Sequence, residues 1–270
     1  MPEVLTEPAS SSISTVRTKK EASSMSPGSS EWGMLDRTRA LDYFNLRGLS
    51  TLSGCDASQL DVVCMKELID NGLDASKGSK PKVTIELKTV DEILSLTVKD
   101  SGEGLSPLDI DRVTDFGKLT SSKYYNKVPN RGSLGNALKV VMGATYALSA
   151  ATSVALPEHP IRIRSRSTEY NIELCIDELK EVVMPRIELG EALLEGTEVR
   201  LALPAYGANW GWKQGHIELL CGYALFNPEA DLSLQMARQG EEQAIHWEYP
   251  SVIERGRRFK GRPSIHWLPV

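Results

Sequence analysis

The sequence has few cysteines, no long apolar run and no excess of positive charge. Its four cysteines include no C-x-x-C pair, so neither a zinc site nor a disulfide framework is indicated, and a reducing compartment fits. No apolar run is long enough to span a bilayer, and the N-terminus lacks the apolar core of a signal peptide. The 31 Lys and Arg against 36 Asp and Glu give a net charge of -5, which excludes a basic surface over the whole chain. We therefore expect a soluble cytoplasmic protein with no membrane partner, whose contact with nucleic acid would come from a local patch or a partner.

Composition divides the 270 residues into three parts. Residues 1–30 contain nine serines and no periodic apolar pattern, which predicts a disordered leader. Residues 31–204 carry the periodic apolar patterns of helices and strands and are predicted to form one domain. Residues 205–270 contain four of the five tryptophans, and we interpret them as a C-terminal segment that begins a transducer-like region.

Apolar periodicity predicts an alternation of helices and strands that belongs to an α+β layered sandwich. The first helix is expected to end at Gly48, and Asp56 is expected to cap the second. Residues 117–131 are polar and basic and predict a mobile loop. The helices are predicted at 32–46, 57–75, 107–116, 134–149 and 217–226, and the strands at 83–87, 94–98, 161–165, 171–176 and 197–203.

The first motif is a polar stripe on the second helix. Glu67, Asp70, Asn71 and Asp74 follow one another at i, i+3, i+4 and i+7, so they share one helical face. A solvated face of a half-buried helix is the ordinary interpretation of such a stripe. Three neighbouring acids repel one another, however, and a bound Mg²⁺ would relieve that repulsion.

The second motif follows the strand predicted at 94–98. Asp100 comes at the strand end, and Gly102 and Gly104 flank one residue, which lets the backbone approach a ligand closely. An Asp in this place can accept a hydrogen bond from an exocyclic amine. The same pattern also marks an ordinary tight turn, so it is weak by itself.

The third motif is a glycine-containing loop that enters a helix at residues 131–139. Free backbone N–H groups and the helix dipole bind phosphate in such an arrangement. The segment before it is basic and resembles a lid, while a flexible surface loop is the ordinary alternative. The spacing of its glycines matches neither a P-loop nor a Rossmann fingerprint.

In this order and spacing, the three motifs resemble those of the GHKL ATPases, the family of gyrase B, the heat-shock chaperone of that class, histidine kinases and MutL. A fourth element of that family is matched by Glu195-Gly196-Thr197. Within the family, the segment at 116–123 and the box at 132–139 are most similar to the B-subunit type of DNA topoisomerase VI. The resemblance spans about residues 32–204. It implies a two-layer α/β sandwich of the Bergerat type, with a mixed, mostly antiparallel sheet and helices on one face.

The resemblance also implies a role for each matching residue, with ATP and Mg²⁺ as ligands. Glu67 takes the place of the catalytic residue that activates the attacking water, and Asn71 takes that of the metal ligand. Asp100 would bind the adenine amine, and Thr197 would support the adenine pocket. The other implied nucleotide contacts are Asp74, Gly102, Gly104, Ser122, Lys123, Gly132, Ser133, Leu134, Gly135, Asn136, Ala137, Leu138 and Lys139.

Two departures from the family pattern are visible. Asn136 and Ala137 stand where the family usually has another Gly, and no transducer lysine can be identified.

The resemblance implies an ATPase that dimerises with ATP and operates a topoisomerase- or nuclease-type catalytic partner, reaching DNA through that complex.

Two alternatives remain open beside the ATPase. One is a nucleotide-gated binding or scaffold module with little hydrolysis, and the other is a protein kinase of the same fold. Phosphate release separates the first from an ATPase, and autophosphorylation tests the second. Glu67, and the absence of a phospho-accepting His helix in the sequence, favour hydrolysis.

Overall fold

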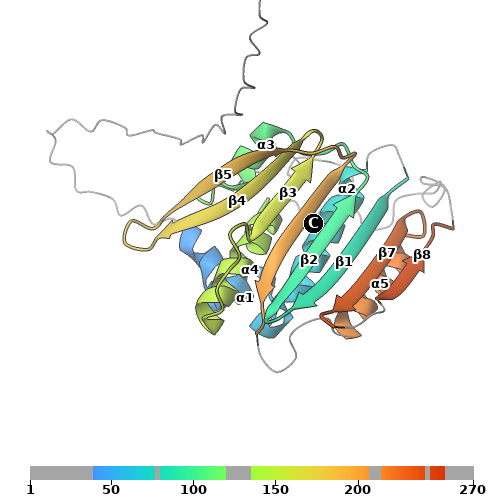
Figure 1. Ribbon diagram of the computed structural model, residues 1–270, viewed down its shortest axis with the longest axis horizontal. Helices are drawn as coiled ribbons and strands as arrows, with labels where there is room; N and C mark the ends of the chain where they lie inside the picture. Colours follow the sequence, from blue (N-terminus) through green and yellow to red (C-terminus); the bar gives the residue numbers. More distant parts are fainter. Residues whose placement is uncertain (1–38, 77–79, 120–134, 207–213, 241–243, 253–270) are drawn as a thin grey trace, which may run out of the picture.

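The computed structural model describes residues 39–76, 80–119, 135–206, 214–240 and 244–252. They form one eight-stranded sheet in the order β5-β4-β3-β6-β2-β1-β7-β8 (Figure 1). Every neighbouring pair of strands is antiparallel except β1 and β7. The strands are β1 Lys82–Val90, β2 Ile93–Asp100, β3 Ile161–Ser165, β4 Thr168–Asp177, β5 Val182–Glu191, β6 Thr197–Pro204, β7 Asp231–Arg238 and β8 Ile245–Tyr249.

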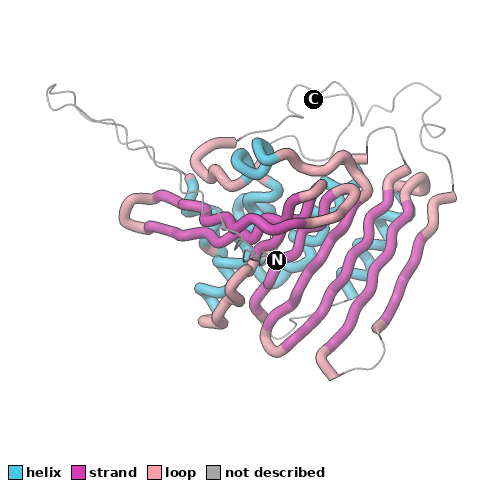
Figure 2. The backbone as a smooth tube through the Cα atoms, turned by 45° about the horizontal axis from the view of Figure 1, so that its top comes forward, coloured by secondary structure: helices cyan, strands magenta, loops and turns pink. Residues whose placement is uncertain are grey.

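The helices cover one face of this sheet, as Figures 1 and 2 show from two directions. The predicted α+β sandwich with a mixed, mostly antiparallel sheet is therefore confirmed. Among the described residues, no helix is long and apolar enough to cross a membrane. The helices are α1 Leu46–Ser53, α2 Leu60–Ala75, α3 Pro107–Val113, α4 Ala137–Thr152 and α5 Gln214–Phe226, with 3-10 turns η1 Ala40–Phe44 and η2 Ala57–Gln59.

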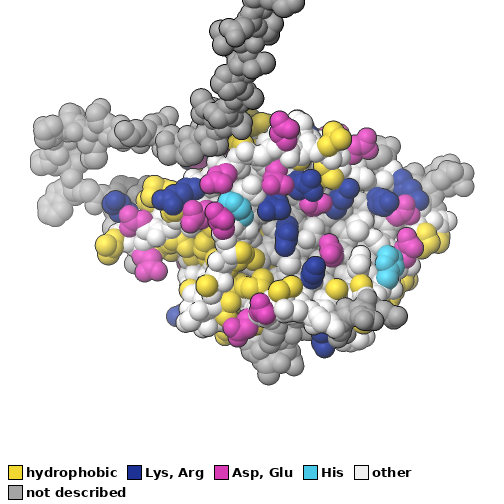
Figure 3. Space-filling model, in the orientation of Figure 1, with side chains coloured by type: hydrophobic (Ala, Val, Ile, Leu, Met, Phe, Trp, Pro, Cys, Tyr) yellow, Lys and Arg dark blue, Asp and Glu magenta, His cyan; other side chains and the backbone are white. Residues whose placement is uncertain are grey.

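The core lies between the sheet and the helices α2 and α4. Along β1 the inward side chains of Val83, Ile85 and Leu87 are fully buried, while Glu86 and Lys88 between and beside them are exposed. This alternation is the mark of a sheet with one face packed and one face in water. Charged side chains of both signs are accordingly spread over the face seen in Figure 3.

The first predicted helix is wrong, because the described part of it is a 3-10 turn followed by a new helix. Asn45 is extended, and its side-chain oxygen accepts a hydrogen bond from the Gly48 N–H at 2.7 Å, so it caps α1. Gly48 lies inside α1 and does not end a helix. A Cβ there would lie 2.1 Å from the carbonyl oxygen of Asp42, so a glycine lets η1 and α1 pack closely.

Three strands were not predicted, namely β5, β7 and β8. Because β7 pairs with β1 in parallel, and β8 with β7, the sheet continues across the boundary that we predicted at residue 205. The helix α5 between β6 and β7 matches the helix predicted at 217–226.

Candidate nucleotide-binding site

The helix α2 packs directly on the end of β2, and this brings the first two motifs together. A Cβ at Gly72 would lie 3.0 Å from the Cβ of Asp100 and 3.2 Å from Val83. An added Cβ would require these two side chains to give way by a few tenths of an ångström. The close approach therefore places Asn71, next to Gly72, near the strand end that carries Asp100, while Glu67 lies more than one turn earlier on the same helix.

The carboxylate of Asp100 is fixed by two backbone donors. Its Oδ1 accepts the N–H of Gly102 at 2.7 Å, and the backbone N–H of Thr197 donates to the carboxylate as well. Burial raises the pKa of Asp100 to about 6, and the two hydrogen bonds oppose that shift. A half-desolvated carboxylate with a raised pKa at the end of a strand is a common feature of binding sites.

Glycines at three positions allow the loop after Asp100 to lie flat against its neighbours. A Cβ at Gly102 would lie 2.5 Å from the Cβ of Ala75, and a Cβ at Gly104 would lie 2.8 Å from the hydroxyl oxygen of Ser165. Gly196 has φ +86, and a Cβ there would lie 2.0 Å from the carbonyl oxygen of Asp100. The loop and the start of β6 are thus in backbone contact.

Sequence reasoning missed Ser165, which ties this loop to β6. Its hydroxyl is buried, accepts the N–H of Leu105 at 2.7 Å and donates to the carbonyl of Gly196 at 3.1 Å. A signal was present, since Ser165 occupies an inward position in the alternating pattern of β3, next after Ile163. A hydroxyl at a core position must find partners, and here they are Leu105, which follows the motif at residues 100–104, and Gly196 of the fourth element.

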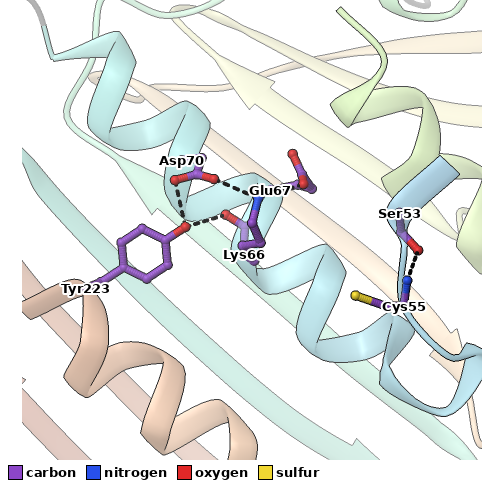
Figure 4. Close-up of polar contacts among 6 residues, drawn as sticks. All are labelled: Ser53, Cys55, Lys66, Glu67, Asp70 and Tyr223. Carbon is purple, nitrogen blue, oxygen red and sulfur yellow. Dashed lines mark hydrogen bonds and ion pairs between the residues drawn. The ribbon is translucent and has the colours of Figure 1, made fainter. Parts of the chain in front are cut away.

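Two of the three acids in the stripe of α2, Glu67 and Asp70, share one ammonium group (Figure 4). The Lys66 Nζ donates to the Glu67 Oε1 at 2.8 Å and to the Asp70 Oδ2 at 3.0 Å. The Tyr223 hydroxyl on α5 donates to the other oxygen of Asp70 at 2.6 Å. Lys66 therefore reduces the repulsion between Glu67 and Asp70 that we expected Mg²⁺ to relieve. Asn71 and Asp74 are half-buried on the following turn.

Only the second half of the glycine box belongs to the described residues. Gly135 has φ +73, and Asn136 precedes α4 without a side-chain capping hydrogen bond. The first N–H groups of a helix that lack a capping side chain suit an anion. Ala137 begins α4, and Leu138 packs against the core. The predicted contacts at Ser122, Lys123, Gly132, Ser133 and Leu134 lie outside the described residues.

The structure gives Lys139 partners within the chain. The side chain is 1% exposed, and its Nζ donates to the carbonyl oxygens of Asp115 and Lys118. Burial lowers the pKa of Lys139, while the charge of Asp115 raises it. The ammonium group thus anchors the turn that leads to residue 119. Its predicted contact with phosphate stays a prediction.

Within the described ranges, no group of three or more His, Cys, Asp or Glu side chains could hold a metal ion. Asn71 offers an amide oxygen, which is a suitable Mg²⁺ donor. The residues present therefore fit a magnesium ion that takes its other ligands from phosphates and water.

Comparisons with known proteins match the same part of the chain. Residues 56–206, more than half of the chain, match the family model described as Histidine kinase-, DNA gyrase B-, and HSP90-like ATPase. Over 125 residues the chain is 32% identical to the B subunit of Type 2 DNA topoisomerase 6 from Natronomonas pharaonis, and the match covers 45% of this chain and 15% of that protein. The chain thus spans a small part of that relative's length. A solved structure, the N terminal domain of a DNA repair protein, matches with a TM-score of 0.39 and 13% identity, over 71% of this chain and 52% of that chain.

Proposed function

Because the chain belongs to the histidine kinase-, DNA gyrase B- and HSP90-like ATPase family, we propose that it binds Mg·ATP between α2 and the end of β2 and hydrolyses it. The observation that carries this proposal is the Asp100 carboxylate. Two backbone N–H groups hold it in place, and Gly72 brings α2 against it. It is a fixed acceptor beside the helix that carries Glu67 and Asn71.

Each residue has one task in the proposed reaction. Asp100 accepts the adenine amine and is oriented by Gly102 and Thr197. Residues Gly135 to Leu138, which lead into α4 and begin it, donate N–H groups to phosphate oxygens. Bound through Asn71, Mg²⁺ would neutralise charge on the phosphates.

Glu67 supplies the base in the chemical step. A water oxygen attacks the γ-phosphorus, the bond from that phosphorus to the bridging oxygen breaks, and ADP leaves with the electron pair. Glu67 takes the proton that the water loses. The products are ADP, inorganic phosphate and a protonated carboxyl group, which returns its proton to solvent.

We further propose that ATP binding drives dimerisation, and that the dimer operates a topoisomerase- or nuclease-type catalytic partner on DNA. The support is the 32% identity, over 125 residues, to the B subunit of a type 2 DNA topoisomerase 6. A nucleotide can shift such an equilibrium only by binding one state more tightly than the other.

Asp100→Ala should weaken ATP binding by about 1–3 kcal/mol at pH 7.5, because the adenine amine loses its acceptor. The pKa of Asp100 is raised to about 6, so the carboxyl is charged above that pH and neutral below it. The difference in affinity between wild type and variant should therefore shrink as the pH falls from 7.5 to 5. Calorimetry on both proteins across this range makes the measurement, and the titration of ATP itself cancels in the comparison. Equal affinities at pH 7.5 would disprove the pocket.

A non-hydrolysable ATP analogue should raise the dimer fraction of the 270-residue chain, whereas ADP should not. The reason is that the proposed dimer binds the γ-phosphate state more tightly. Analytical ultracentrifugation with each nucleotide makes the comparison. Asp100→Ala is the control: because we expect it to bind nucleotide more weakly, its dimer fraction should not rise at a low concentration of the analogue. Identical sedimentation in all nucleotide states would refute dimerisation by ATP.

A further inference from the structure

The helix α5 lies alongside α2 over three successive contacts. Near its start, a Cβ at Gly215 would lie 3.7 Å from a methyl group of Val62. One residue later, His216 Nε2 lies 3.7 Å from Asp61 Oδ2. Two turns further along, Tyr223 reaches Asp70. The hydroxyl of Tyr223 is therefore placed by a packed helix.

Asp70 is the centre of this contact. Its side chain is only 12% exposed, and a buried carboxylate needs donors to offset its lost hydration. Tyr223 donates to Oδ1 at 2.6 Å, and Lys66 donates to Oδ2 at 3.0 Å. The carboxylate thus joins a residue of α5 to a residue of α2 that lies 157 positions earlier in the chain.

Lys66 binds Glu67 as well as Asp70. Its ammonium group lies between the two carboxylates and donates to Glu67 Oε1 at 2.8 Å, which leaves the Oε2 oxygen of Glu67 for other partners. Burial lowers the pKa of Lys66, but its hydrogen bonds and ion pairs with Glu67 and Asp70 outweigh burial and raise it. The ammonium is therefore charged at neutral pH. Without a second carboxylate, a lysine side chain would sample many rotamers.

We propose that Lys66 is a positioning residue for Glu67, and that Asp70 and Tyr223 hold Lys66 in the orientation that this task requires. The inference rests on the proposed function, in which Glu67 is the general base. By fixing one oxygen of the carboxylate, Lys66 aims the other at the attacking water. The docking of α5 on α2 thereby sets the geometry of hydrolysis.

The ion pair of Lys66 with Glu67 is partly exposed, with side chains 46% and 23% accessible. Partly exposed ion pairs add little to stability. Loss of this pair alone should therefore appear in the rate of the chemical step, whereas losing the Lys66 donor to the buried Asp70 carboxylate should also lower the stability of Lys66→Met. A misplaced catalytic group lowers kcat, whereas ground-state binding of ATP does not depend on the aim of Glu67.

The test compares kcat and KM for ATP in the 270-residue chain with the dissociation constant of a non-hydrolysable analogue. Lys66→Met should lower kcat by about tenfold, with KM and the dissociation constant unchanged. Lys66→Arg, which keeps the positive charge, should retain most of the wild-type kcat. Tyr223→Phe should lower kcat by about threefold, and it should have no further effect in the Lys66→Met background. Tyr249→Phe removes a tyrosine hydroxyl that contacts Cys221 on the far side of α5, and should behave as wild type.

Two results would overturn the inference alone, while Glu67 remains essential for turnover. One is an unchanged or raised kcat in Lys66→Met, and the other is a loss of analogue affinity that equals the loss of rate. If Lys66→Met fails to fold, Tyr223→Phe decides by the same criterion, since it removes a single oxygen atom. A wild-type chain without Glu67-dependent hydrolysis would overturn the proposed function, and this inference with it.

Discussion

Glu67→Ala should lose about 10²–10⁴-fold in the rate of ATP hydrolysis and keep its affinity for ATP. Glu67 touches the attacking water in the proposed mechanism and none of the groups that bind the adenine. Its carboxylate is held by Lys66 at 2.8 Å on a well-packed helix, so removing it leaves the helix in place. Single-turnover phosphate release measures the rate, and binding of a non-hydrolysable analogue measures the affinity.

The matched control for this variant is Glu86→Ala on β1. Glu86 is exposed on the face of the sheet that the helices do not cover, and its loss changes the net charge by the same amount. Glu86→Ala should therefore hydrolyse ATP at the wild-type rate. If Glu67→Ala does so too, the assignment of the base is wrong. If the wild-type chain binds ATP and releases no phosphate, a nucleotide-gated binding module describes it better.

Local patterns in the sequence predict the centre of the fold well. The alternation of Val83, Ile85 and Leu87 with polar residues marks β1, because every second side chain of a half-buried strand is apolar. The same regularity marks β2 as far as Val98, two residues short of its observed end at Asp100, so the place of the motif that begins at Asp100 followed from the strand.

The strands β5 and β7 were not predicted, for two different reasons. β5 lies at the edge of the sheet and is exposed along most of its length, so no period-two burial marks it. β7 does alternate, with Leu232, Leu234 and Met236 buried. Because the composition changes after residue 204, we assigned β7 to a separate C-terminal segment and did not place it in the same sheet.

Contacts between distant parts of the chain explain why the site could be predicted only in part. The motifs mark Glu67 and Asp100 as candidate site residues, because each motif is defined by neighbours in the sequence. No local sequence pattern predicts the hydrogen bond between Tyr223 and Asp70, because these residues are 153 positions apart in the chain. The inward position of Ser165 suggests buried partners but does not say that they are Leu105 and Gly196. Those partners depend on how the loop after β2 and the start of β6 pack.

Gly196→Ala should lower the free energy of unfolding by about 2–5 kcal/mol and should weaken ATP binding as well. Alanine at φ +86 costs about 1–2 kcal/mol. In addition, the new Cβ would lie 2.0 Å from the carbonyl oxygen of Asp100, and forcing apart two packed backbones costs roughly 1–3 kcal/mol more, by typical values for overpacking. Because Asp100 itself must move, the substitution should also displace the proposed adenine acceptor. Urea unfolding and calorimetry with ATP measure the two effects.

Gly240→Ala separates the two causes, because Gly240 has φ +83 and a Cβ there would meet no described atom within 4 Å. This variant suffers the backbone strain alone and should lose about 1–2 kcal/mol of stability with no change in ATP affinity. The difference between the two variants then measures the cost of separating β6 from the end of β2. Equal losses of stability, or normal ATP affinity in Gly196→Ala, would mean that the contact between Gly196 and Asp100 does not support the nucleotide site.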